Sequence, residues 1–278
     1  MPTSRPRRVR LDFELDRPST VRPGEAAPTP EMEDHLVCLL SPHSFEADQY
    51  RVLSQFLSEA RVGRSLKVLA VTSPAAGDGK TTTAINLAAT LAQTSGSRVL
   101  LVDTDLRRPL VGGNLGLAPG GPGLAEAAVD DRIELSEVVR PTPYNLTVLP
   151  AGDPPENPYQ VLESARVGHL LEQARDAYDC VVLDTPPVLL VPDCKLMSQW
   201  IDGFLLVVSA HRTPRKLLGE ALSALDESKV LGIVFNGDDR PLAGYYGKYY
   251  GGYYHERAGG EWRGSAKRDR KAGRRPWR

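Results

Sequence analysis

The chain has 278 residues, is 41% hydrophobic and carries a net charge of −1. Its length suits one large domain or two small ones. Because the net charge is near zero, the whole molecule has no strong electrostatic attraction to nucleic acid, and no nucleic-acid partner is expected. No apolar run approaches the length of a membrane-spanning helix, so none is expected. Cys38, Cys180 and Cys194 have no paired spacing, which indicates a reducing compartment, and Cys180 lies in an apolar run typical of a core.

The first segment, residues 1–35, is rich in Pro, Arg, Glu and Thr and lacks hydrophobic periodicity, so we expect a disordered arm. Its first residues are basic, but no apolar stretch follows them, and a signal peptide is therefore not expected. Residues 41–60 show helical spacing, with Phe45, Tyr50 and Leu53 on one face. The first regular element is therefore predicted to be an amphipathic helix.

From residue 66 onward, short apolar runs alternate with helical patterns. The expected strands are at 66–72, 98–103, 146–152, 180–187, 203–209 and 230–236. The expected helices are at 81–94, 158–178 and 214–228. Buried strands separated by helices predict an α/β fold, with a mostly parallel twisted sheet covered on both faces, in one domain at 36–240. Ligands in such sheets bind at the carboxyl ends of the strands.

The stretch SPAAGDGKTTT (73–83) follows a strand, opens a helix and contains the Gly-Lys-Thr that ends a P-loop. Its glycines let the backbone approach a polyphosphate, Lys80 would reach the β- and γ-phosphates, and the Thr81 hydroxyl would bind Mg²⁺. Pro74 departs from the pattern, which has Gly there. A glycine-rich turn without a ligand is the alternative, but the strand–loop–helix context favours a P-loop NTPase. The expected phosphate-binding residues are Ala76, Gly77, Asp78, Gly79, Lys80, Thr81 and Thr82.

Three carboxylates follow buried strands beside this loop. Asp103 and Asp105 lie in VLLVDTDLRRP (99–109), and Asp184 lies in VVLDTPP (181–187). Such acids can hold Mg²⁺ directly or through water. Two positions apart on an extended chain, Asp103 and Asp105 can face the same side, one binding metal and the other taking a proton. A single strand-end Asp is more often a helix cap or turn former, but three converging with Lys80 favour a Mg-nucleotide site.

The core patterns stop after Gly237, and a tyrosine cluster at 241–256 and a basic disordered tail at 257–278 follow. The cluster holds six of the ten tyrosines of the chain: Tyr245, Tyr246, Tyr249, Tyr250, Tyr253 and Tyr254. Taken alone, this Gly/Tyr segment is typical of a low-complexity tail that mediates assembly. The basic end is interpreted as a solvated tail, with contact to anionic lipid or nucleic acid as the alternative.

These motifs resemble those of one family, the bacterial tyrosine kinases of capsule and exopolysaccharide synthesis. SPAAGDGKTTT, LLVDTDLRRP and VVLDTPP are similar to its Walker A, Walker A′ and Walker B motifs. The resemblance continues at 145–164, 202–213 and 230–236, covers about residues 41–254, and includes the terminal tyrosine cluster. It implies an ATP- and Mg²⁺-dependent autokinase that phosphorylates the six tyrosines and regulates polysaccharide polymerisation and export.

The same resemblance implies roles for individual residues. Asp103 corresponds to the residue that activates the tyrosine hydroxyl, Asp105 and Asp184 to the Mg²⁺-site acids, and Asn236 to a residue near the adenine. Lys80, Asp103 and Asp105 are therefore the candidate catalytic residues. The implied partners are a membrane-embedded chain-length regulator, which would recruit the cytoplasmic kinase to the inner face of the cell membrane, and a cognate tyrosine phosphatase.

Two other functions compete with a kinase. A partition or division-site ATPase would carry a signature lysine at the position of Ala75, and it would lack a tyrosine-rich tail. The other competitor is a nucleotide-binding adaptor whose tail only tethers.

Assembly is a further expectation. Family members form rings through E-x-x-R-x-x-R, whereas this chain has Asp48, Arg51 and Ser54 at those positions, which does not favour the same ring. Because the tail follows Asn236 closely, we expect transfer to tyrosines of another subunit, that is, in trans.

Overall fold

The computed structural model describes residues 32–61, 65–94 and 96–237. The tyrosine cluster, the basic tail and most of the expected N-terminal arm lie outside these ranges, so the predictions made for them remain predictions. The described end of the arm makes contacts with the domain. The Glu33 N–H donates to the carbonyl oxygen of Asn114, and the His35 carbonyl accepts a hydrogen bond from Asn86 Nδ2.

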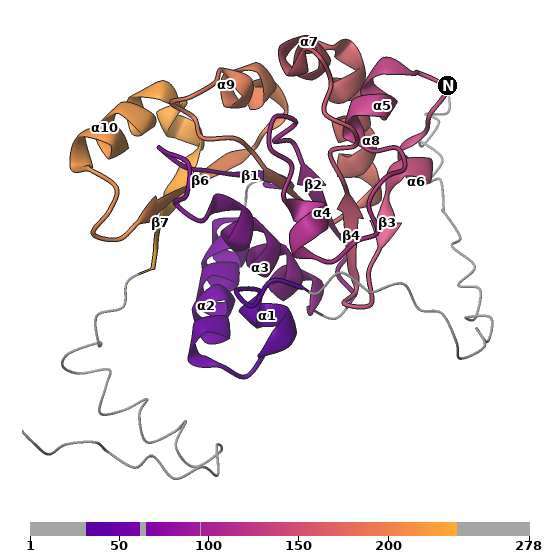
Figure 1. The fold of residues 1–278 in the computed structure, drawn as a ribbon. Coiled ribbons are helices and arrows are strands. Elements are labelled where there is room, and N and C mark those ends of the chain that lie inside the picture. Colours follow the sequence, from indigo (N-terminus) through magenta and orange to yellow (C-terminus); the bar gives the residue numbers. More distant parts are fainter. Residues whose placement is uncertain (1–31, 62–64, 95, 238–278) are drawn as a thin grey trace, which may run out of the picture.

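A seven-stranded sheet forms the centre of the described part of the chain, in the order β3-β4-β2-β5-β1-β6-β7 (Figure 1). Its neighbouring strands are parallel except for the antiparallel pair β3–β4. The strands are β1 (Val68–Thr72), β2 (Val99–Asp103), β3 (Arg140–Pro141), β4 (Leu146–Leu149), β5 (Cys180–Asp184), β6 (Gly203–Ser209) and β7 (Val230–Asn236). The predicted mostly parallel sheet is confirmed.

Helices cover both faces of this sheet. Successive side chains of a strand point to opposite faces, so apolar residues on each face pack against the helices on that side. On β1, Val68 and Ala70 pack into one apolar core, whereas Leu69 and Val71 pack into another. Figure 1 shows α1, α2 and α3 gathered on one side of the sheet and α5, α8 and α10 on the other. Cys180 is buried in the core, as its apolar context predicted. The structure is therefore a three-layer α/β domain.

The helices of the described residues are mostly short. They are α1 (Val37–Leu40), α2 (Phe45–Ala60), α3 (Lys80–Ala92), α4 (Val111–Asn114), α5 (Leu124–Val129), α6 (Leu135–Val138), α7 (Pro158–Glu163), α8 (Ala165–Ala177), α9 (Asp193–Met197) and α10 (Arg215–Ala224), with 3₁₀ turns at Ser198–Trp200 and Glu227–Lys229. None of these helices has the length and hydropathy that crossing a membrane requires.

The prediction of one long helix at 158–178 is wrong. The helix breaks at Ser164, whose backbone is extended (φ −64°, ψ 141°) and whose hydroxyl caps α8 by accepting the Val167 N–H. Serine competes for backbone hydrogen bonds and therefore favours a cap over a helix interior. The sequence also gave no indication of α4, α5, α6 and α9, which are too short to show periodicity.

Candidate active site

The loop between β1 and α3 takes its shape from two glycines. Gly77 has a φ of 84° and Gly79 a φ of 90°, in the left-handed region that glycine adopts without strain. A Cβ on Gly79 would lie 1.9 Å from Nδ2 of Asn236, whereas one on Gly77 would meet nothing within 4 Å. Conformation therefore requires glycine at both positions, and space also requires it at Gly79.

Side chains hold this loop from behind. The Asp78 carboxylate accepts hydrogen bonds from the Ala75 N–H at 3.0 Å and from the Thr213 hydroxyl at 2.6 Å. Asn236, at the end of β7, donates its amide to the Asp78 carbonyl at 3.0 Å. The structure thus places Asn236 against the loop backbone, and its expected contact with an adenine remains a prediction.

Four predicted site residues meet at the carboxyl ends of the central strands. Lys80 Nζ lies 3.0 Å from Asp105 Oδ2 and 3.9 Å from Asp184 Oδ1. The Thr81 hydroxyl donates to Asp184 Oδ2 at 2.7 Å. All four residues are buried, and the lysine ammonium compensates the two carboxylates that burial would otherwise destabilise. The sequence motifs therefore converge in space as predicted.

The donor set fits Mg²⁺ held together with a nucleotide. Asp184 Oδ1 is buried and, among the described residues, receives no hydrogen bond, so one carboxylate oxygen beside the Thr81 hydroxyl is available to a cation. No three His, Cys, Asp or Glu residues in the described ranges are grouped as a metal cage. Mg²⁺ is usually held by one or two carboxylates plus phosphate oxygens, so a cage is not required.

Burial raises the pKa of Asp184 to about 6, against the lowering effects of Lys80 and Thr81. A cation bound at this carboxylate would favour its charged form. Lys80 and Thr81 thus compensate the negative charge of the buried Asp184 carboxylate only in part.

Asp103 lies differently from the other acids. Its carboxylate accepts three backbone hydrogen bonds, from Asp105 at 3.1 Å, Leu110 at 3.1 Å and Val111 at 3.0 Å. Burial and the neighbouring Asp184 raise the pKa of Asp103 to about 8. Strand β2 ends at Asp103, and the Thr104 N–H still donates to the Asp184 carbonyl, so Asp105 lies just beyond the ladder. The two acids of this motif have different partners, backbone N–H groups for Asp103 and Lys80 for Asp105, and the proton-accepting role of Asp103 remains a prediction.

A cavity of about 450 Å³ opens at this site. Its lining residues are Ala76, Gly77, Gly79, Lys80, Thr81, Thr82, Asp105, Arg107, Arg108, Leu110, Asn114, Pro186, Pro187, Leu190 and Val191. The residues from Arg107 onward were not predicted, although the paired arginines directly after the Asp105 motif were a usable signal. Arg107 is held by the buried Asp193 at 3.3 Å. Asp103 does not line this cavity.

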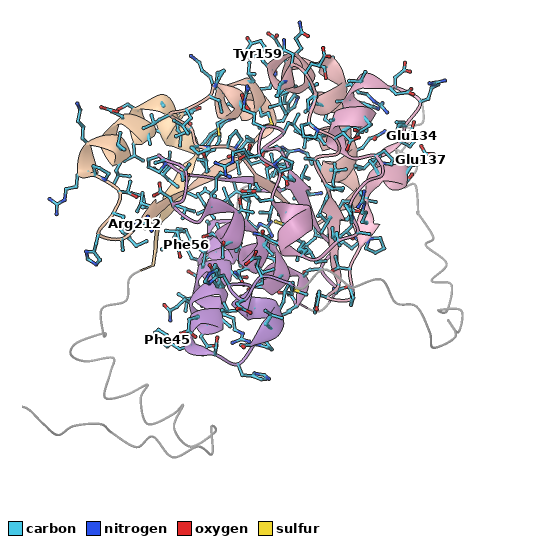
Figure 2. The ribbon with its side chains drawn as sticks, viewed as in Figure 1. Phe45, Phe56, Glu134, Glu137, Tyr159 and Arg212 are labelled. Carbon is cyan, nitrogen blue, oxygen red and sulfur yellow. The ribbon has the colours of Figure 1, made fainter. Side chains whose placement is uncertain are left out.

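The residues expected to bear on ring assembly lie on α2. Arg51 pairs with Asp48 and also donates to the carbonyl oxygen of Pro42, so both partners belong to the same chain. Ser54 is buried with 9% of its surface exposed. Phe56, farther along the helix, is half-exposed beside Gly232 of β7 (Figure 2). The first arginine of the motif is therefore satisfied within the chain, and the third position does not face solvent.

A parallel sheet, a glycine loop that opens a helix and a buried Lys–Thr–Asp cluster together define a P-loop nucleotide-binding protein. Comparison with known proteins supports this class. The family described as "AAA domain" matches residues 66–199.

More specific similarity links the chain to named kinases. Tyrosine-protein kinase YwqD of Bacillus subtilis is 36% identical over 222 residues, which are 79% of this chain and 92% of that protein. The kinase domain of Escherichia coli tyrosine kinase ETK superposes with a TM-score of 0.71 at 27% identity, over 82% of this chain and 89% of that one. The succinoglycan biosynthesis transport protein ExoP of Rhizobium meliloti is 33% identical over 78% of this chain, but only 29% of its own length. The chain belongs to the bacterial tyrosine-protein kinase family.

Proposed function

We propose that this chain is an ATP-dependent protein-tyrosine kinase that phosphorylates its own terminal tyrosine cluster. The observation that carries the proposal is the cluster of Lys80, Thr81, Asp105 and Asp184, in which the first three line the cavity and Asp184 is buried directly behind Lys80 and Thr81. The proposed phosphoacceptors are Tyr245, Tyr246, Tyr249, Tyr250, Tyr253 and Tyr254.

Mg-ATP, when bound, supplies the phosphoryl group. The glycine loop and the N-terminus of α3 would hold the phosphates, and Lys80 would neutralise charge on the terminal phosphate. Thr81 and Asp184, with Asp105 near them, would hold the metal. Phosphoryl transfer needs mainly position and charge compensation from the protein, which this rigid, buried cluster supplies.

A carboxylate must accept the proton of the tyrosine hydroxyl, whose usual pKa is about 10. Asp105 lines the cavity, where it pairs with Lys80 and accepts the Arg108 N–H, whereas Asp103 accepts three backbone N–H groups and does not line the cavity. We therefore propose that Asp105 faces the acceptor and that Asp103 mainly fixes the turn. Loss of transfer in Asp105→Asn, with transfer retained in Asp103→Asn, supports this assignment, and the opposite result contradicts it.

We propose transfer in trans, although chain length permits both routes. Tyr245 follows the last described residue, Gly237, by eight residues, which span at most about 29 Å when extended. A Lys80→Met chain with its tail intact, mixed with an active chain whose six cluster tyrosines are Phe, tests the route. Label on the Lys80→Met chain demonstrates transfer in trans, and its absence contradicts it.

The biological role proposed for this activity is regulation of polysaccharide polymerisation and export. ExoP, whose name places it in succinoglycan biosynthesis and transport, supports this role by similarity. The proposed setting is the cytoplasm, with recruitment to the inner face of the membrane by a chain-length regulator and reversal by a tyrosine phosphatase. Each phosphate adds about −1.5 to −2 charges, so full modification would change how the cluster binds basic or acidic surfaces.

Intact-mass analysis after incubation with Mg-ATP separates the kinase from its two rivals. A kinase gains multiples of about 80 Da, and the gain disappears in Lys80→Met. An ATPase turns over ATP without gaining mass, and an adaptor does neither. Tyr159 on α7 provides a check within the domain, because it is 38% exposed outside the cluster (Figure 2). A gain that persists after all six cluster tyrosines are changed to Phe contradicts the proposed acceptors.

A further inference from the structure

The order of the strands determines from which side an acceptor reaches the terminal phosphate. Strands β5 and β2 lie on one side of β1, and β6 and β7 lie on the other. Lys80 extends toward Asp105, which follows β2, and toward Asp184, the last residue of β5. Asn236, at the end of β7, contacts the loop from the opposite side. The terminal phosphate therefore lies on the β5–β2 side, and an acceptor in line with it must pass the turns that follow these two strands.

Those two turns carry exposed leucines at the mouth of the cavity. Leu110 is 44% exposed and Leu190 is 63% exposed, and both line the cavity that contains Lys80. A single exposed leucine needs no explanation, but two that share one cavity mouth form an apolar entrance. Pro187 and Val191 line the same cavity.

Hydrogen bonds hold the backbone at both leucines. The Leu110 N–H donates to Asp103 Oδ2 at 3.1 Å, and the Leu190 N–H donates to the Pro187 carbonyl at 3.1 Å. The backbone segments that carry the two leucines are therefore held before any ligand binds, which lowers the entropic cost of ordering them on binding. Asp103 has a positioning role in this arrangement, because its carboxylate accepts the Leu110 N–H and so holds the backbone that carries this leucine.

We propose that Leu110 and Leu190 grip the ring of an acceptor tyrosine from residues 245–254 and thereby select tyrosine as the substrate. This inference rests on the proposed kinase function. A phenol ring presents two flat apolar faces and a polar tip, so its faces would pack on the leucines while its hydroxyl reaches the phosphate. Its oxygen then forms a bond to the γ-phosphorus, the bond from that phosphorus to the ADP oxygen breaks, and the phenolic proton passes to Asp105. A serine or threonine side chain is too small to cover the two leucines.

A kinetic test uses full-length chains in trans. The donor carries Phe at all six cluster positions, and the acceptor is the Lys80→Met chain with its tyrosines intact. We expect Leu110→Ala or Leu190→Ala in the donor to raise the KM for the acceptor about tenfold, because each change removes most of one apolar wall. The matched control is Val129→Ala, which removes an exposed apolar side chain outside the cavity lining and should leave KM unchanged.

The affinity for nucleotide distinguishes leucines that contact the acceptor tyrosine from leucines that contact the adenine. The Kd of a fluorescent ATP analogue should change by less than about twofold in both leucine variants. An equal loss of nucleotide affinity, or an unchanged KM for the acceptor, overturns the inference while leaving the kinase function intact. A donor that transfers no phosphate even with both leucines present refutes the proposed function, and the inference with it.

A binding measurement provides a readout apart from turnover. A labelled peptide of residues 242–256 should bind the full chain in the presence of Mg²⁺ and a non-hydrolysable ATP analogue, and the double leucine-to-alanine variant should weaken that binding. Leu190→Met in the otherwise unchanged chain, which keeps an apolar side chain of similar volume, should retain the affinity of the unchanged chain. Equal peptide affinity in all of these chains overturns the inference.

Discussion

Gly79 and Gly77 form a matched pair that tests the structure of the phosphate-binding loop. Both have positive φ, at 90° and 84°, but only a Cβ on Gly79 would collide with Asn236. We expect Gly79→Ala to destabilise the ligand-free chain more than Gly77→Ala does, because the first change adds a collision to the shared backbone strain.

The magnitude follows from these two contributions. An alanine in the left-handed region costs about 1–2 kcal/mol in either variant. At Gly79 the Asn236 amide must also move, which breaks its hydrogen bond to the Asp78 carbonyl and costs about 1 kcal/mol or more. We therefore expect the free energies of unfolding of the two variants to differ by about 1–3 kcal/mol.

Urea denaturation without nucleotide, followed by far-UV circular dichroism, measures this difference. A third variant, Asn236→Ala, removes the colliding amide, so in that background the two glycine changes should cost nearly the same. Equal destabilisation by Gly77→Ala and Gly79→Ala in the otherwise unchanged chain would refute the reasoning. So would a difference that persists in the Asn236→Ala background.

Three further predictions concern other parts of the domain. Burial raises the pKa of Asp184 from 3.8 to about 6 and that of Asp103 to about 8, so these two acids should make the stability of the ligand-free chain fall as pH rises from about 4 through about 8. Asp184→Asn should reduce the part of this fall between about pH 4 and pH 6 in urea midpoints measured with EDTA. Asp202→Ala should lower the free energy of unfolding by about 2–4 kcal/mol, because its carboxylate accepts the N–H groups of Lys67 and Val68 at the start of β1 and pairs with Arg175. A smaller loss in urea melts would contradict this. Gly168→Ala should destabilise the domain because its Cβ would lie 2.5 Å from the Trp200 ring. Gly219→Ala, with open space around its Cβ, should instead stabilise helix α10 by up to about 1 kcal/mol. Melting temperatures of the two variants that shift in the same direction would contradict this contrast.

The sheet could be predicted from the sequence because its inner strands are buried on both faces. Inner strand β6 has the predicted bounds, and β2 and β5 begin or end within a few residues of theirs. The edge strand β7 also has the predicted bounds, although it is only partly buried. Continuous apolar runs signal such strands directly. Because ligands bind at the carboxyl ends of parallel strands, the positions of Lys80 and Asp184 followed from the same pattern.

The features that were not predicted from the sequence are either too short to show a periodic pattern or arise only when the chain is folded. The helices between β2 and β4 have four to six residues, too few for a periodic pattern. Leu110 directly precedes the short helix α4 and Leu190 lies in a turn after β5, and nothing in the sequence indicates that they share a cavity mouth. The break at Ser164 was obscured because apolar spacing continues across it, although the hydroxyl caps the second helix.

The two acids of the DTD motif show where the alternation rule stops. The rule holds only while the chain stays extended, and β2 ends at Asp103. Past that point the Asp105 N–H turns back to the Asp103 carboxylate, and this turn directs the Asp105 side chain toward Lys80. Asp103 is then buried under backbone donors, where it can hold the turn, while Asp105 lines the cavity. Two identical residues, two positions apart, thus have different environments because the strand ends between them.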